Sequence, residues 1–130
     1  MRSRRRIAAA AALVVLAADL ADSAATRTAY FHPRPLWLLG GGAAAATAVL
    51  VLAPRVPSLA LSVGAGMTTG GALGMLVAGL VWSRGVPDPL VRGSVAFNLG
   101  DVAIAVGDSL FLASALLVAW RRRHQLQLPI

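Results

Sequence analysis

The sequence predicts an all-α membrane protein: one transmembrane domain, residues 1–130, built as a four-transmembrane-helix bundle. Apolar residues make up 58% of the chain and the mean hydropathy is +0.74, outside the usual range for soluble domains. Four apolar runs approach or exceed the ~20 residues that cross a bilayer core. The 12 basic residues, all arginine, lie mostly beside these runs. We therefore assign the net charge of +7 to membrane flanks and expect no nucleic-acid partner.

The composition also limits the chemistry. The chain contains no cysteine, which excludes disulfides, thiol nucleophiles and cysteine metal sites. No serine has a histidine or lysine partner at motif spacing, and neither an HExxH-type metal cluster nor a phosphate-binding glycine loop is present. We expect no metal and no other cofactor. The remaining candidates for chemistry are the five acidic residues, Asp19, Asp22, Asp88, Asp101 and Asp108.

The first apolar run covers residues 7–21 and follows the basic segment MRSRRR. A charged start, a short apolar stretch and small residues near Ala21 are typical of a cleavable signal peptide. The alternative is a retained first span, somewhat shorter than the ~20 residues of a full crossing. Asp19 closes the run and favours the retained span.

The second and third spans are predicted over residues 36–53 and 58–82, separated by a proline turn at residues 54–57. The polar loop before the second span contains His32, a lone histidine that we expect to be interfacial or solvated. In the third span, small residues recur at every fourth position and predict a helix-packing stripe. They are Ser62, Gly66, Gly70, Gly74 and Ala78.

The fourth span is predicted over residues 95–120, and the arginines indicate which way the four spans run. If the amino terminus is cytoplasmic, so is the carboxyl terminus. Eight arginines then lie inside: Arg2, Arg4, Arg5, Arg6, Arg55, Arg121, Arg122 and Arg123. Four lie outside: Arg27, Arg34, Arg84 and Arg92. This bias satisfies the positive-inside rule, so we predict that both termini are cytoplasmic.

With this orientation, three aspartates fall at one level. Asp19, Asp88 and Asp101 all lie at the predicted outer ends of spans or in an outer loop. Asp108 follows Asp101 on the same helical face, ~10 Å deeper. Ionisable groups at this depth are costly, so they suggest a functional site. Polar residues also gather at membrane edges for other reasons, and Pro-Asp-Pro around Asp88 is equally good turn sequence.

Two carboxylates held close together in a low-dielectric site cannot both ionise. One keeps a proton, and the pair can then activate water and protonate a leaving amine, as in aspartic proteases. Such a pair titrates as a unit. Hydrolysis of a peptide bond is therefore a chemistry that such a pair of aspartates could perform.

The motif around Asp101 supports this interpretation. FNLGDVAIAVG, residues 97–107, resembles the FN-x-A-D-x-x-I-x-x-G motif of the lipoprotein signal peptidases (signal peptidase II), and GGALGM, residues 70–75, resembles their GGALGN. The resemblance implies a four-helix enzyme of the bacterial cytoplasmic (inner) membrane. It implies two catalytic aspartates, which map onto Asp101 and onto Asp88 in Gly-Val-Pro-Asp-Pro-Leu.

The resemblance also implies a substrate and a partner. The substrate is a diacylglyceryl-modified prolipoprotein that is cleaved just before its lipidated cysteine, and the surrounding membrane lipids are the partner. Asn98 matches the family's asparagine beside the active site and is expected to orient a carboxylate or the scissile carbonyl. Asp19 resembles the aspartate of the family's first-helix motif. Asp108 is expected to contact Asp101 or to form a buried polar link to another span.

The chain departs from the family pattern at several positions. Met75, Ala78 and Gly79 replace N-x-x-D-R, and Ser23 stands where the family has lysine. Prolines flank Asp88 where the family has valine and phenylalanine, which alters any strand pairing there. The N-x-G-x-x-F motif is missing and the first outer loop is short. The expected substrate contacts outside the two aspartates are therefore reduced.

Two alternatives to a peptidase remain open from sequence. One is a catalytically inactive relative that binds lipoprotein or lipid. The other is a small transporter or channel subunit that uses Asp101 and Asp108 as a proton or cation path. Below Asp108 the fourth span offers only Ser109 and Ser114, so such a path would stop near mid-helix. The sequence does not define the oligomeric state.

Overall fold

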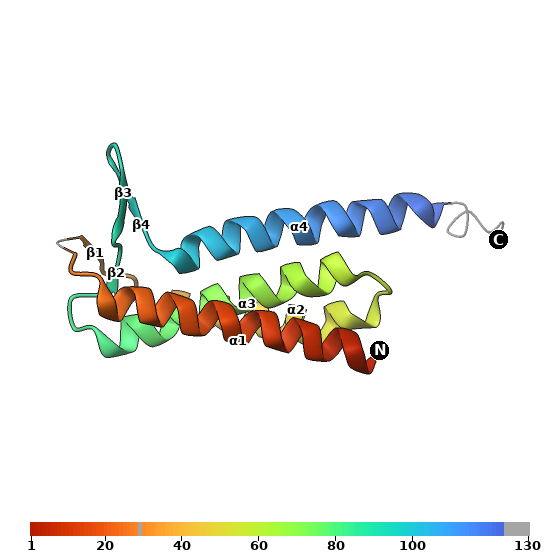
Figure 1. Ribbon diagram of the computed structural model, residues 1–130, viewed down its shortest axis with the longest axis horizontal. Coiled ribbons are helices and arrows are strands. Elements are labelled where there is room, and N and C mark those ends of the chain that lie inside the picture. Colours follow the sequence, from red (N-terminus) through yellow and green to blue (C-terminus); the bar gives the residue numbers. More distant parts are fainter. Residues whose placement is uncertain (29, 124–130) are drawn as a thin grey trace.

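The computed structural model describes residues 1–28 and 30–123, which form a bundle of four long helices (Figure 1). The helices are α1 (Arg2–Ala25), α2 (Leu36–Leu52), α3 (Leu59–Val81) and α4 (Leu99–Arg121), with the 3₁₀ turn η1 (Ala53–Arg55) after α2. Each is long and apolar enough to cross a membrane, α2 when taken together with η1. The predicted set of four apolar helices is thus confirmed.

Helix α3 is the centre of the bundle. It packs against α1, α2 and α4, and it is the most buried of the four helices. Its glycines allow these contacts: a Cβ atom on Gly70 would lie 2.5 Å from the Ala12 carbonyl oxygen of α1. On the opposite side, a Cβ atom on Gly64 would lie 2.7 Å from the Gly107 carbonyl oxygen of α4. The small-residue stripe is therefore a packing face, as predicted, and a second one faces α4.

Helix α2 is attached to α3 by a polar link within the bundle. The Thr69 hydroxyl of α3 donates to the Ala46 carbonyl of α2 at 2.8 Å, and it also lies 2.7 Å from the Ala65 carbonyl of its own helix. Thr69 is fully buried, so these bonds satisfy a group that has no access to water.

Four short strands gather at one end of the bundle, which we name the β end (Figure 1). Strand β1 (Phe31–His32) pairs antiparallel with β2 (Val86–Pro87), and β3 (Leu90–Arg92) pairs antiparallel with β4 (Val95–Phe97). The β3–β4 hairpin turns at Gly93, whose φ of +62° favours glycine. The sequence prediction had no strands, because segments of two or three residues are too short to show a period of two.

Two helix boundaries differ from the prediction. Helix α1 extends from Arg2 to Ala25 and so includes the arginine-rich start. Helix α4 begins at Leu99 and not at residue 95, because residues 95–97 pair with β3 and Asn98 caps the helix. The start of α1 and the end of α4 lie together at the end opposite the β end (Figure 1). The segments whose arginines were predicted to be cytoplasmic therefore lie at one end of the bundle, and those predicted to be outside lie at the other. The orientation in a membrane stays a prediction.

The contact between α3 and α4 can be tested by a pair of glycine substitutions. A Cβ atom on Gly71 would lie 2.6 Å from the Gly100 carbonyl oxygen, whereas one on Gly40 would have no neighbour within 4 Å. We expect Gly71→Ala to lower the free energy of unfolding by about 1–3 kcal/mol through overpacking. Gly40→Ala should leave it unchanged or raise it. Thermal unfolding in detergent measures both, and equal effects would contradict the packing described here.

Candidate active site

Four of the predicted site residues meet at the β end. Asp19 comes from the last turns of α1, and Asp88 lies between β2 and β3. Asn98 is the residue before α4, and Asp101 is in the first turn of that helix. All but Asp101 are fully buried. The structure thus brings together residues that are spread over the whole chain.

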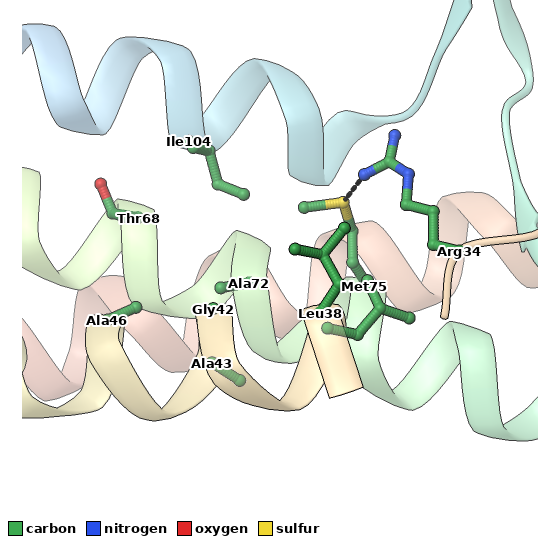
Figure 2. Close-up of a pocket in the computed structure, with 10 residues that line it drawn as sticks. Arg34, Leu38, Gly42, Ala43, Ala46, Thr68, Ala72, Met75 and Ile104 are labelled. Atoms are coloured by element: carbon green, nitrogen blue, oxygen red, sulfur yellow. Dashed lines mark hydrogen bonds between the residues drawn. The ribbon is translucent and has the colours of Figure 1, made fainter. Parts of the chain in front are cut away.

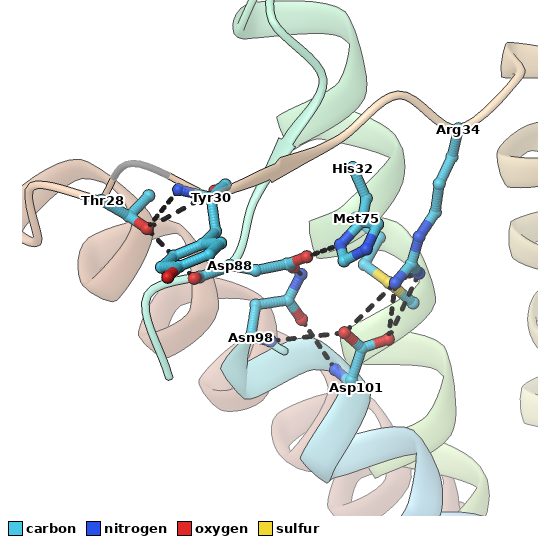
Figure 3. Close-up of polar contacts among 8 residues, drawn as sticks. All are labelled: Thr28, Tyr30, His32, Arg34, Met75, Asp88, Asn98 and Asp101. Atoms are coloured by element: carbon cyan, nitrogen blue, oxygen red, sulfur yellow. Dashed lines mark hydrogen bonds and ion pairs between the residues drawn. The ribbon is translucent and has the colours of Figure 1, made fainter. Parts of the chain in front are cut away.

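Asn98 is the junction of this cluster (Figure 3). Its side-chain amide donates to Asp88 Oδ1 at 3.2 Å, and its side-chain oxygen accepts from the Asp101 backbone N–H at 2.8 Å. In return, the Asn98 backbone N–H donates to Asp101 Oδ2 at 3.3 Å, which completes a capping box. A single side chain therefore starts α4 and links the two predicted catalytic aspartates.

Asp88 is held by the paired strands β1 and β2. Its backbone N–H donates to the Tyr30 carbonyl at 3.0 Å, and its carbonyl accepts from the Thr28 hydroxyl at 3.1 Å. Its carboxylate contacts Asn98 through Oδ1 and the Nδ1 atom of His32 through Oδ2 (Figure 3). The alternative of a solvated turn residue is wrong, because Asp88 is completely buried.

His32 and Arg34 are site residues that the sequence did not single out. The expectation of a solvated or interfacial side chain for His32 is confirmed, since 53% of it is accessible. The β1–β2 pairing in addition places its imidazole on Asp88. Arg34 forms an ion pair with Asp101: Nη1 and Nη2 both lie 3.2 Å from Oδ1, and Nη2 lies 3.3 Å from Oδ2. Arg34 Nη1 is also 2.8 Å from the Met75 sulfur. Their partners are 56 and 67 residues away along the chain, so local spacing gave no signal.

Asp19 lies beneath the cluster and joins α1 to the start of α4. Its Oδ1 accepts from the Gly100 backbone N–H at 2.7 Å. Gly74 and Gly100 both lie against this carboxylate, since a Cβ atom on either would meet Oδ2. That Oδ2 atom is buried and has no hydrogen-bond partner among the described residues. The predicted role of Asp19 near the other two aspartates is consistent with this position.

Asp108 lies apart from the cluster. It accepts from the Thr68 hydroxyl of α3 at 2.7 Å, and no bond joins it to Asp101 within the described residues. Of the two expectations, the polar link to another span is the one that the structure shows. The link is on the surface of the bundle and is not buried, because Asp108 is exposed. This position gives no support to a path from Asp101 to Asp108.

Two cavities flank the site. The first, about 270 Å³, lies between α2, α3 and α4, and among the described residues Arg34 is the charged one that lines it (Figure 2). Its other lining residues are Leu38, Leu39, Gly42, Ala43, Ala46, Thr68, Ala72, Met75 and Ile104. The second, about 200 Å³, lies between Tyr30 and His32 on one side and the β3–β4 hairpin on the other. No aspartate is among the described residues that line either cavity; Arg34, the partner of Asp101, lines the first, and His32, which contacts Asp88, lines the second.

Comparison of the chain with protein-family models, with curated proteins and with solved structures finds no match. A function can therefore be assigned to the site only from its own geometry and from the motifs that surround Asp101 and Gly70.

The double role of Asn98 can be separated by two substitutions. Asn98→Ser keeps a good helix cap but is too short to hold Asp88, whereas Asn98→Ala loses both functions. We expect the Ser variant to lose ~1–3 kcal/mol of stability, since a buried carboxylate oxygen loses its donor. The Ala variant should lose a further ~1 kcal/mol for the cap. Denaturation in detergent tests this order; equal losses would show that only one of the two functions matters.

Proposed function

We propose that this protein is a membrane aspartyl endopeptidase that resembles signal peptidase II and removes signal peptides from diacylglyceryl-modified prolipoproteins. The observation that carries the proposal is the link through Asn98. It joins Asp88 and Asp101, the two aspartates to which the motifs point, at one end of a four-helix bundle. The predicted orientation puts that end on the outer face of a bacterial cytoplasmic membrane.

The different partners of the two aspartates suggest different roles. Asp101 is ion-paired with Arg34, and 27% of its side chain is accessible. We therefore assign to Asp101 the role of the ionised carboxylate that activates water. Asp88 is buried between the imidazole of His32 and the side-chain amide of Asn98. We therefore assign to Asp88 the role of the protonated carboxyl group of the pair.

The reaction then follows from these roles. Asp101 takes a proton from water as the water oxygen bonds to the scissile carbonyl carbon, and Asp88 gives its proton to the carbonyl oxygen. Asp101 next gives its proton to the amide nitrogen and Asp88 takes one back from the diol as the C–N bond breaks. The products are a carboxylic acid and an amine, and both aspartates end in their starting states.

The two cavities suit a substrate that is part lipid and part peptide. An acyl chain or the apolar signal helix matches the cavity between α2, α3 and α4, which leads to Arg34 beside Asp101. The polar chain that follows the cleavage point matches the cavity beside His32 and the hairpin. A scissile bond between these two portions would lie at the aspartates.

A second candidate is an inactive relative that binds lipidated substrate without cleaving it. The observation in its favour is Arg34, whose guanidinium covers one side of the Asp101 carboxylate. Turnover by the unmodified protein separates the two functions. The substrate is a precursor peptide carrying diacylglyceryl-cysteine.

The aspartates can be tested one at a time. We expect Asp101→Asn and Asp88→Asn each to reduce cleavage of the diacylglyceryl-cysteine precursor by at least ~10²–10⁴-fold, because each removes a group that moves a proton. Asp22→Asn is the matched control, since Asp22 contacts Thr26 one turn away on α1, at 3.2 Å. It should cleave normally. Full activity of either site variant, at normal expression, would remove that aspartate from the mechanism.

Entry through the helices can be tested at adjacent glycines of α2. Gly42 lines the apolar cavity and Gly41 does not, and a Cβ atom on either meets no neighbour within 4 Å. We expect Gly42→Leu to fill the cavity and lower kcat/KM for the lipidated precursor at least ~10-fold, about the discrimination that a filled apolar pocket gives. Gly41→Leu should leave kcat/KM unchanged. Equal kinetics for both variants would exclude this cavity as the substrate path.

A further inference from the structure

Within the described residues, the side chains of Asn98 and His32 contact the Asp88 carboxylate, and no proton was assigned to His32 in the steps above. The four polar atoms of Asp88 have partners at Tyr30, Thr28, Asn98 and His32. Of these four contacts, the imidazole is the one made by a side chain that can both accept and donate a proton. A completely buried carboxyl group thus has a proton-exchanging neighbour in direct contact.

The other face of His32 is open to solvent. Its side chain is 53% accessible and forms part of the wall of the 200 Å³ cavity at the hairpin. Asp88 itself has no exposed surface. The imidazole is therefore the part of the His32–Asp88 pair through which the pair equilibrates with protons in the surrounding water.

The neighbouring charged groups have other partners. Arg34 and Asp101 are paired with each other. The guanidinium of Arg84 lies 4.4 Å from the centroid of the Phe31 ring, next to His32 on β1. Asp19 bonds to Gly100 on the α1 side of the cluster. Within the described residues, Asp88 is the charged partner that His32 contacts directly.

We propose that His32 is a positioning residue that shares the proton of Asp88 and keeps the site in its acid-competent state. This inference rests on the proposed function. The proton lies between His32 Nδ1 and Asp88 Oδ2, passes from Oδ2 to the substrate carbonyl oxygen, and returns when the C–N bond breaks. An imidazole nitrogen can take a proton from a carboxyl group and return it, which an amide cannot do. We therefore expect loss of the imidazole to narrow the pH range in which the enzyme is active.

Asparagine is the variant that isolates this role. Its amide nitrogen can occupy the position of Nδ1 and donate to Asp88, but an amide neither takes up nor releases a proton. We expect His32→Asn to retain KM within ~2-fold and to move the alkaline limb of the kcat–pH profile to lower pH by at least ~1 unit. His32→Ala should lower kcat at every pH. An unchanged profile in His32→Asn would reduce His32 to a structural hydrogen bond and overturn the proposal.

The other histidine of the sequence gives a matched control. His124 lies outside the described residues and 26 positions after Asn98 in the sequence. His124→Asn should leave both kcat and the pH profile unchanged. If the alkaline limb shifted as much in His124→Asn as in His32→Asn, the shift would not be specific to His32, and the proposal would be overturned.

A second measurement distinguishes this inference from the proposed function. In detergent micelles, ¹⁵N NMR reports the protonation of each imidazole nitrogen of His32 as the pH changes. We expect the His32 signals to titrate differently in Asp88→Asn, because the proton-sharing partner is gone. Identical titrations in both proteins would overturn the inference even if the precursor is cleaved. Absence of cleavage with a clear difference would overturn the proposed function alone.

Discussion

The cap on α4 is the constraint on which the candidate site depends. Asn98 must sit before the helix with its side-chain oxygen on the Asp101 N–H, and the same geometry aims its amide at Asp88. Because the side chain is buried, each of these bonds matters more than it would in water. One residue therefore caps a membrane-length helix and also holds one oxygen of a carboxylate two strands away.

Close helix packing supports this arrangement from below. Glycines on both sides of α3 let α1 and α4 approach its backbone, and this approach brings Asp19 of α1 to the Gly100 amide of α4. A larger residue at Gly71 or Gly74 would displace the first turn of α4 or the Asp19 carboxylate. The glycines of α3 thus affect the site by setting how closely α1 and α4 approach, although they contribute no side chain to it.

Much of the helical architecture could be predicted from sequence, because hydropathy and small-residue spacing are local signals. The strands could not, since β1 and β2 have two residues each. The same pairing explains why the contact between His32 and Asp88 was not predicted, because β2 brings that partner to it. Arg34 was counted only as a loop charge, although a lone arginine between prolines facing three predicted carboxylates was a usable electrostatic signal. Motif resemblance, and not periodicity, pointed to Asn98.

The position of α2 has a consequence for how the protein meets its surroundings. Helices α2 and α4 each pack on α3 and only weakly on each other, and the apolar cavity lies between them. In a bilayer, hydrocarbon chains that reach this gap would complete its wall. Its width would then respond to lateral pressure and to the chain length of the lipids. The same polypeptide would thus present a different opening in thin, fluid membranes than in thick, ordered ones.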